Sequence, residues 1–166
     1  TTDDSFLQRC VHESLRLHPA SPVAWREASE SFSLPDGTPV VAGDSVLIDL
    51  MSANLEPSLF GQDAALFNPH REVANRIPPF GLTFGIGIHT CFGRDIAGGL
   101  GNAKESDQAA HLGTLTNLLK SLLQHGARPD PAHPPVADTA TERPNWGTYP
   151  LLVGTPQLAK TTGVTG

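Results

Sequence analysis

The chain has 166 residues, enough for one domain with a sizeable hydrophobic core, and its apolar fraction of 39% is typical of globular proteins. A net charge of −6 without any Lys/Arg run argues against nucleic acid and acidic membrane surfaces as partners. Fifteen prolines and sixteen glycines favour turns and irregular connections over a regular helical bundle.

The two cysteines, Cys10 and Cys91, lie far apart in differently patterned segments, which is no disulfide framework and suits a reducing compartment. No apolar run approaches the length of a membrane span, and no signal-peptide pattern opens the chain. We therefore expect a cytoplasmic protein with no membrane partner. The opening TTDDSF lacks an initiator Met and runs directly into a helical pattern, so the chain is expected to be part of something longer.

The first predicted element is a helix over residues 5–17. Asp3 and Asp4 offer an N-cap and favourable charge in the first turn, and Pro19 ends the pattern. Apolar residues recur along it at helical spacing: Phe6, Leu7, Cys10, Val11 and Leu15. On this pattern we expect Cys10 to lie in the core.

Glu13 and Arg16 stand three residues apart on one face of this helix, close enough to form an ion pair. Taken alone, the spacing favours an exposed surface pair, which contributes under about 1 kcal/mol.

Short extended segments follow the helix. Residues 22–28 predict a strand that carries Arg26, and residues 31–50 predict a small antiparallel system with turns at Gly37 and Gly43. A short helix is expected over residues 57–60. Residues 71–79 are polar, irregular and proline-ended. Taken alone, Arg26 is most often a solvated strand arginine.

The most informative stretch is FGIGIHTCFG, residues 84–93, which sets Cys91 among glycines and aromatics. Glycine reaches positive φ and lets other groups approach the backbone closely. Phe84 supplies apolar shielding and His89 a polar group, so this loop suits a thiolate held beneath a large planar cofactor, of which haem is the foremost candidate. The alternative is that Cys91 is a small buried apolar residue or an incidental thiol, and His89 an ordinary loop histidine.

A helix begins after this loop, but Gly98, Gly99 and Gly101 and the polar residues 102–108 predict that it is broken or delayed. Its amphipathic part is expected over residues 112–123, with Gly126 as its C-terminal cap. Residues 127–144 are proline-rich and predicted to be irregular, and residues 145–153 predict one terminal strand. Within that strand, Trp146 and Tyr149 either line a substrate cavity or cap a core.

Three segments together carry a family resemblance. The pattern Phe-x-x-Gly-x-His-x-Cys-x-Gly at residues 84–93, ESLR at residues 13–16 and FNPHR at residues 67–71 resemble the haem-ligand loop, the Glu-x-x-Arg helix and the Phe-x-Pro-x-Arg segment of the cytochrome P450 family. The resemblance covers residues 5–97 well and residues 112–153 loosely. It departs from the family at Leu55 and Glu56 and in the insertion after Ala97.

The resemblance implies specific roles around a haem b cofactor. Cys91 would be the axial iron ligand and the catalytic centre, and Arg26 and His89 would bind the haem propionates. Phe84, which would pack near the sulfur, and the glycines Gly85 and Gly93 would complete the cofactor contacts. A second implied group is structural: Glu13 would be buried between Arg16 and Arg71, bracing the proximal side of the cysteine loop.

The implied fold is α+β, mainly helical with small antiparallel β-sheets, and corresponds to the C-terminal, proximal half of the cytochrome P450 fold. Residues 1–153 would belong to this domain and residues 154–166 would form a loose tail. The implied activity is a monooxygenase that inserts one oxygen atom of O2 into a small organic substrate. Its partners would be a ferredoxin or flavoprotein reductase and an N-terminal half that carries the distal helix.

Two alternatives stay open at this point. One is a haem-thiolate enzyme that uses peroxide or rearranges an oxygenated lipid without an electron donor. The other is a non-catalytic haem-binding or sensor half-domain.

Overall fold

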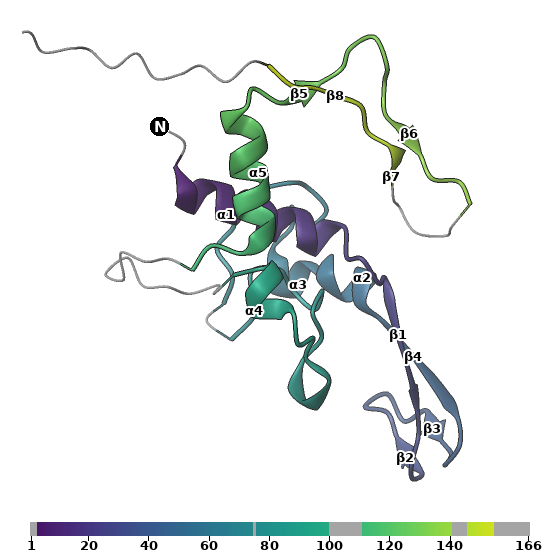
Figure 1. Cartoon of the computed structure of the whole chain (residues 1–166). Helices are drawn as coiled ribbons and strands as arrows, with labels where there is room; N and C mark the ends of the chain where they lie inside the picture. The colour runs from purple at the N-terminus through teal and green to yellow at the C-terminus, as the bar shows by residue number, and fades with distance from the viewer. Residues whose placement is uncertain (1–2, 75, 100–110, 141–145, 155–166) are drawn as a thin grey trace, which may run out of the picture.

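The computed structural model describes residues 3–74, 76–99, 111–140 and 146–154. The expected tail beyond residue 154, the polar stretch 102–108 and the start of the predicted terminal strand at Asn145 lie outside these ranges. The fold is α+β, with helices gathered around the first helix, α1, and with small two-stranded antiparallel sheets (Figure 1).

Helix α1 spans Asp4–Leu17, in agreement with the helix predicted over residues 5–17. The Asp3 carboxylate caps it by accepting hydrogen bonds from the backbone N–H groups of Ser5 and Phe6. Its inner face buries apolar and charged residues side by side: Leu7, Val11, His12, Glu13, Arg16 and Leu17. Because charged residues are almost never fully buried unless paired, this face is expected to hold a polar network.

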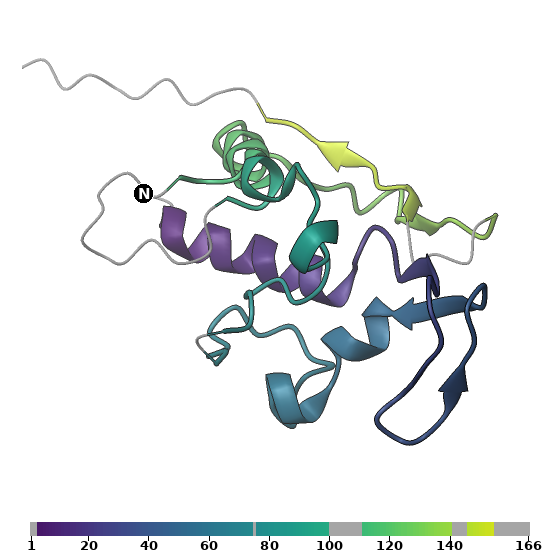
Figure 2. The ribbon, with the colours of Figure 1, turned by 90° about the horizontal axis from the view of Figure 1, so that it is seen from below.

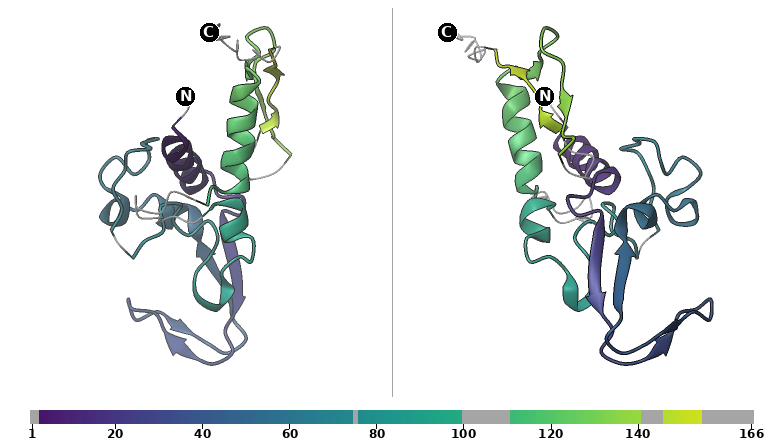
Figure 3. Two further views of the ribbon diagram at one scale, coloured as in Figure 1. Left: turned by 60° about the vertical axis from the view of Figure 1, so that its left-hand side comes forward. Right: turned by 90° about the vertical axis from the view of Figure 1, so that its right-hand side faces the viewer.

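The predicted antiparallel system is present. Strand β1 (Val23–Glu27) pairs with β4 (Ser45–Asp49), with Val23 opposite Asp49 and Glu27 opposite Ser45. Strands β2 (Phe32–Ser33) and β3 (Pro39–Val40) form a hairpin, and its turn places Gly37 at a φ of 88°. The β1–β4 ladder projects away from the helices (Figure 1, Figure 3).

Two short helices follow β4. Helix α3 (Pro57–Phe60) was predicted, whereas α2 (Leu50–Asn54) was not. The Asp49 carboxylate caps α2 through the backbone N–H of Ser52, which lets the chain turn directly from strand to helix. The apolar core lies around α1, α2, α3 and the coil that follows, and comprises Leu7, Val11, Leu17, Ala28, Val40, Leu50, Phe60, Ala64 and Phe80.

The helix after the cysteine loop is interrupted, as its glycines predict. A 3-10 turn (η1, Gly87–His89) precedes helix α4 (Arg94–Ala97), and the amphipathic helix α5 (Thr114–Gln124) begins beyond the insertion. Helix α5 packs against α1 (Figure 1, Figure 2). It ends with Gly126 at a φ of 68°, as expected for a C-terminal cap.

The C-terminal segment contains more strand than the sequence predicts. Strand β5 (Arg128–Pro129) pairs with β8 (Leu151–Leu152), and β6 (Val136–Ala137) pairs with β7 (Trp146–Thr148). The expectations of an irregular stretch at 127–144 and of one strand at 145–153 were therefore wrong. Pro150 separates β7 from β8, because proline has no N–H for a continuous ladder.

Candidate functional site

The cysteine loop is closed on itself by backbone hydrogen bonds. The N–H of Cys91 donates to the carbonyl of Phe84 at 2.7 Å, and the Thr90 hydroxyl donates to the carbonyl of Gly87 at 2.9 Å. Gly85 has a φ of 67°, and a Cβ built on it would lie 2.8 Å from the His89 carbonyl oxygen. Only glycine therefore fits at position 85, and it permits the tight turn that presents Cys91.

The Cys91 side chain is exposed and unbridged at the outer face of this loop. Three residues close to it in the sequence are exposed and apolar: Ile88, Phe92 and Ile96 are 96%, 103% and 69% exposed. Clustered exposed apolar side chains mark a binding surface. A thiol rimmed by apolar groups is the donor set that a thiolate-ligated haem requires, so the residues present fit that cofactor.

Arg26 and His89, the two residues expected to bind the haem propionates, can each still accept an acidic partner. Arg26 lies on β1 with its Nη1 donating to the Trp25 carbonyl at 2.7 Å, and among the described residues it forms no ion pair. His89 ends the η1 turn with its side chain exposed. No hydrogen bond among the described residues joins Arg26 to the Cys91 loop, although the ladder and the loop project from the same end of the helices (Figure 3).

Phe84 supports the loop from the interior. Its ring meets the buried Phe80 ring edge-to-face, with centroids 5.0 Å apart. A Cβ on Gly98 would lie 3.0 Å from the Phe84 ring, so the ring also packs against the end of α4. A Cβ on Gly93 would lie 3.8 Å from the Cys91 sulfur, which places Gly93 beside the thiol.

Glu13 and Arg16 form a buried pair, so the surface-pair interpretation was wrong. Arg16 is fully buried, and its Nε and Nη2 atoms each donate to a different oxygen of the Glu13 carboxylate at 2.8 Å. The remaining nitrogen, Nη1, donates to the Asn54 carbonyl at 2.6 Å, and the guanidinium stacks over the Phe60 ring at 4.9 Å. Every face of this buried cation therefore has a partner.

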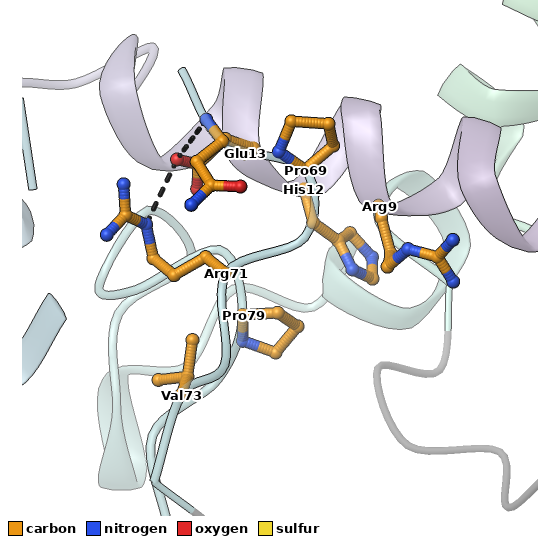
Figure 4. A pocket seen from close by; sticks show the side chains of 8 residues that line it. Arg9, His12, Glu13, Pro69, Arg71, Val73 and Pro79 are labelled. Carbon is orange, nitrogen blue, oxygen red and sulfur yellow. Dashed lines mark hydrogen bonds and ion pairs between the residues drawn. The ribbon is translucent and has the colours of Figure 1, made fainter. Parts of the chain in front are cut away.

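Arg71 reaches the same carboxylate from the coil after α3. Its Nε donates to Glu13 at 3.1 Å, and its Nη1 to the Asp63 carboxylate at 2.6 Å. The backbone N–H of Asn68 adds a bond to Glu13 at 3.0 Å. Figure 4 shows Glu13 and Arg71 facing each other beside a small cavity of about 30 Å³. The structure thus joins Glu13, Arg16 and Arg71, and we call these three residues the frame.

The frame sets the charge states of its acids. Burial raises the pKa of Glu13, but hydrogen bonds from Arg16, Asn68 and Arg71 and the Arg16 charge outweigh it, so the pKa lies below its usual value. Hydrogen bonds from Arg71 and Asn68 likewise lower the pKa of Asp63. Burial lowers the pKa of Arg71, but its bonds to Asp63 and Glu13 reverse this, so the net shift is upward.

Asn54 links α1 to the segment before the cysteine loop, and no role for it was predicted. It is fully buried; its amide nitrogen donates to the Arg16 carbonyl at 3.0 Å, and its amide oxygen accepts from the Leu82 N–H at 2.7 Å. Gly81, at a φ of 60°, lets this amide approach, because a Cβ there would collide with the Asn54 side chain. In the sequence, the only local indication of this role was that an asparagine lies beside the helix predicted over residues 57–60.

Comparison with models of known protein families shows which family has this arrangement of residues. The family model described as Cytochrome P450 matches residues 5–98, more than half of the chain. The chain belongs to the cytochrome P450 family. The matched residues contain the frame, Arg26 and the Cys91 loop, and they end where the helix is interrupted.

Curated cytochrome P450 proteins from several kingdoms are similar to this chain. Human cytochrome P450 4F11 is 33% identical over 96 residues, which cover 55% of this chain and 18% of the relative. Cytochrome P450 714B2 of Oryza sativa subsp. japonica is 30% identical over 143 residues, covering 85% of this chain and 24% of the relative. The chain thus spans about a fifth of the length of the curated relatives it matches.

Solved cytochrome P450 structures share the fold. CYP109E1 from Bacillus megaterium, solved in complex with corticosterone, has a TM-score of 0.68 at 20% identity, covering 91% of this chain and 35% of that chain. CYP154A1 from Streptomyces coelicolor A3(2) has a TM-score of 0.62 at 26% identity, covering 89% of this chain and 33% of that one. None of the described helices combines the length and apolar character that crossing a membrane requires.

Proposed function

We propose that this chain supplies the proximal half of a haem-thiolate monooxygenase that acts on a small organic substrate. The observation that carries the proposal is the exposed Cys91 thiol, presented by a glycine-dependent loop among exposed apolar side chains. Family membership supports it, because cytochrome P450 proteins bind haem. We assign residues 1–153 to this domain and haem b as its cofactor.

Each site residue has a distinct task in this proposal. Cys91 provides the thiolate ligand, and Arg26 and His89 pair with the two propionates through charge-assisted hydrogen bonds. Gly85 permits the tight turn of the loop, Gly93 keeps the backbone beside the sulfur free of a side chain, and Phe84 holds the loop against the core. When bound, haem with a thiolate ligand supplies the chemistry that activates O2 for transfer of one oxygen atom to substrate, the other leaving as water.

The rest of such an enzyme is proposed to pack on an apolar groove between α1 and α5. The groove has a volume of about 380 Å³ and is lined by Cys10, Val11, Ser14, Leu15, Phe67, Leu115 and Leu119. Cys10 is therefore half-buried at its edge, not in the core as expected, and burial raises the pKa of its thiol against the opposing charge of Arg9. A native protein with the mass of this chain alone would contradict the need for an N-terminal half.

We further propose a cytoplasmic enzyme that receives electrons from a ferredoxin or a flavoprotein reductase. Turnover of the assembled enzyme should then depend on such a donor. Turnover with peroxide alone, at the same rate and without any donor, would instead favour a peroxide-using enzyme.

The absorption spectrum of the reduced, carbon monoxide-bound protein tests thiolate ligation. We expect the assembled haem protein to show a strongly red-shifted Soret band, because the thiolate donates electron density to the iron. Cys91→Ser should abolish this band, whereas Cys10→Ser, which removes the other thiol, should retain it. A parent protein without the band, or a Cys91→Ser variant that keeps it, would overturn the proposal.

A further inference from the structure

The two parts of the interrupted helix meet end to end. Gly99, just after α4, pairs with Leu112 in an antiparallel bridge. Gly113, which precedes α5, lies so close to the end of α4 that a Cβ on it would collide with the Ala97 carbonyl. Glycine is required at this junction, because any side chain would push the two helix ends apart.

One side chain of α1 bridges this junction. The Gln8 amide nitrogen donates to the carbonyl of Gly98 at the end of α4, and its amide oxygen accepts from the N–H of Gly113 at 3.1 Å. The hydroxyl of Thr116, a fully buried residue of α5, also donates to this oxygen at 2.8 Å. Two donors on the oxygen fix the orientation of the amide. Gln8 therefore satisfies groups that a continuous helix would pair internally.

His12 lies one turn further along α1 and contacts the same carbonyl group, that of Gly98. Its Nε2 atom lies 2.6 Å from the Gly98 carbonyl oxygen, and the side chain is buried. Its ring meets Phe80 edge-to-face at 5.3 Å, and Phe80 in turn meets Phe84, whose carbonyl accepts the Cys91 N–H. Helix α1 thus contacts the cysteine segment directly at Gly98 and, through the ring of Phe80, at Phe84.

We propose that Gln8 is a positioning residue that joins the two parts of the interrupted helix and thereby fixes the Cys91 loop beneath the cofactor. The cofactor part of this inference rests on the proposed function. The joining itself rests only on the contacts of Gln8, Gly98, Gly113 and Thr116.

Hydrogen exchange of the full chain without cofactor tests the joining. Gln8→Met keeps the length of the side chain but removes its hydrogen bonds. We expect exchange of the Cys91 N–H to speed up about ten- to a hundredfold, as loss of the hydrogen bonds to Gly98, Gly113 and Thr116 implies, with no change in the β1–β4 ladder. The control Gln124→Met, an exposed glutamine at the end of α5, should leave both regions unchanged. An unchanged Cys91 N–H in Gln8→Met, or equal acceleration in the ladder, would overturn the proposal.

A second variant distinguishes the joining of the two helix parts by Gln8 from a general loss of stability. Linking Gly98 directly to residue 113, with residues 99–112 removed and with Gly113→Ala to restore helix propensity, should give one continuous helix that pairs these groups internally. In that background Gln8→Met should no longer change exchange at Cys91, whereas an equal effect in both backgrounds would contradict the proposal.

The haem-loaded protein supplies the remaining measurement. Gln8→Met should convert part of the red-shifted carbon monoxide band to a band at shorter wavelength, as expected for a displaced thiolate. A full red-shifted band in Gln8→Met would refute the positioning role even if exchange increases. Absence of the band in the parent would instead refute the proposed function and leave the exchange result standing.

Discussion

Replacing Glu13 by glutamine is expected to lower the free energy of unfolding by about 3–5 kcal/mol. Glutamine has nearly the same shape but no charge, so the fully buried Arg16 would lose its counter-charge while remaining out of water. Arg71 would lose one of its two acidic partners in the same step. Chemical denaturation of the full protein measures this change.

Asp95→Asn provides the matched control. Asp95 also pairs with an arginine, Arg94, at 2.8 Å, but both side chains are substantially exposed, and its loss should leave the free energy of unfolding nearly unchanged. Equal effects of the two substitutions would contradict a buried frame.

The same variant has an expected pH signature. Because the pKa of Glu13 is lowered in the fold, its contribution to stability is present above the ordinary glutamate pKa of about 4.3 and is lost as pH falls through the folded-state value. Glu13→Gln should therefore lose less stability than the parent on acidification below that pH. If the free energy of unfolding fell with pH equally in Glu13→Gln and in the parent, Glu13 would not be a titrating member of the frame.

Replacing Asn54 by leucine is expected to have the second-largest effect on stability. Leucine fills a similar volume but leaves the Arg16 carbonyl and the Leu82 N–H without their partner, at about 1–3 kcal/mol for each buried group. The loss should be accompanied by faster hydrogen exchange at Leu82. Asn117→Leu, which removes one exposed side-chain hydrogen bond on α5, should change neither quantity appreciably.

Local patterns predicted the elements whose partners are close in sequence. The apolar spacing of α1, the turn glycines Gly37 and Gly43 and the short helix α3 were all expected, because each depends on interactions within a few residues. Gly126 closes α5 for the same reason. Weak strands such as β5 and β6 were not expected, because their pairing depends on partners further along the chain, β8 beyond Pro150 for β5 and β7 for β6.

The polar network of α1 lay beyond local reasoning. Glu13 and Arg16 looked like a surface pair, and only the family resemblance indicated that Arg71, 58 positions from Glu13, completes a buried frame. Gln8 finds its partners 90 and 105 residues away, and Asn54 bonds residues on both sides of it in sequence. Such contacts have no periodic signature, so the roles of Gln8 and Asn54 were not predicted, whereas the family resemblance predicted the frame.

Iron K-edge X-ray absorption of the assembled, haem-loaded protein tests the identity of the axial ligand most directly. We expect one sulfur neighbour of the iron in the parent and in Cys10→Ser, and none in Cys91→Ser. Iron with only nitrogen and oxygen neighbours in the parent, or a sulfur neighbour that persists in Cys91→Ser, would contradict the assignment of Cys91 as the haem ligand.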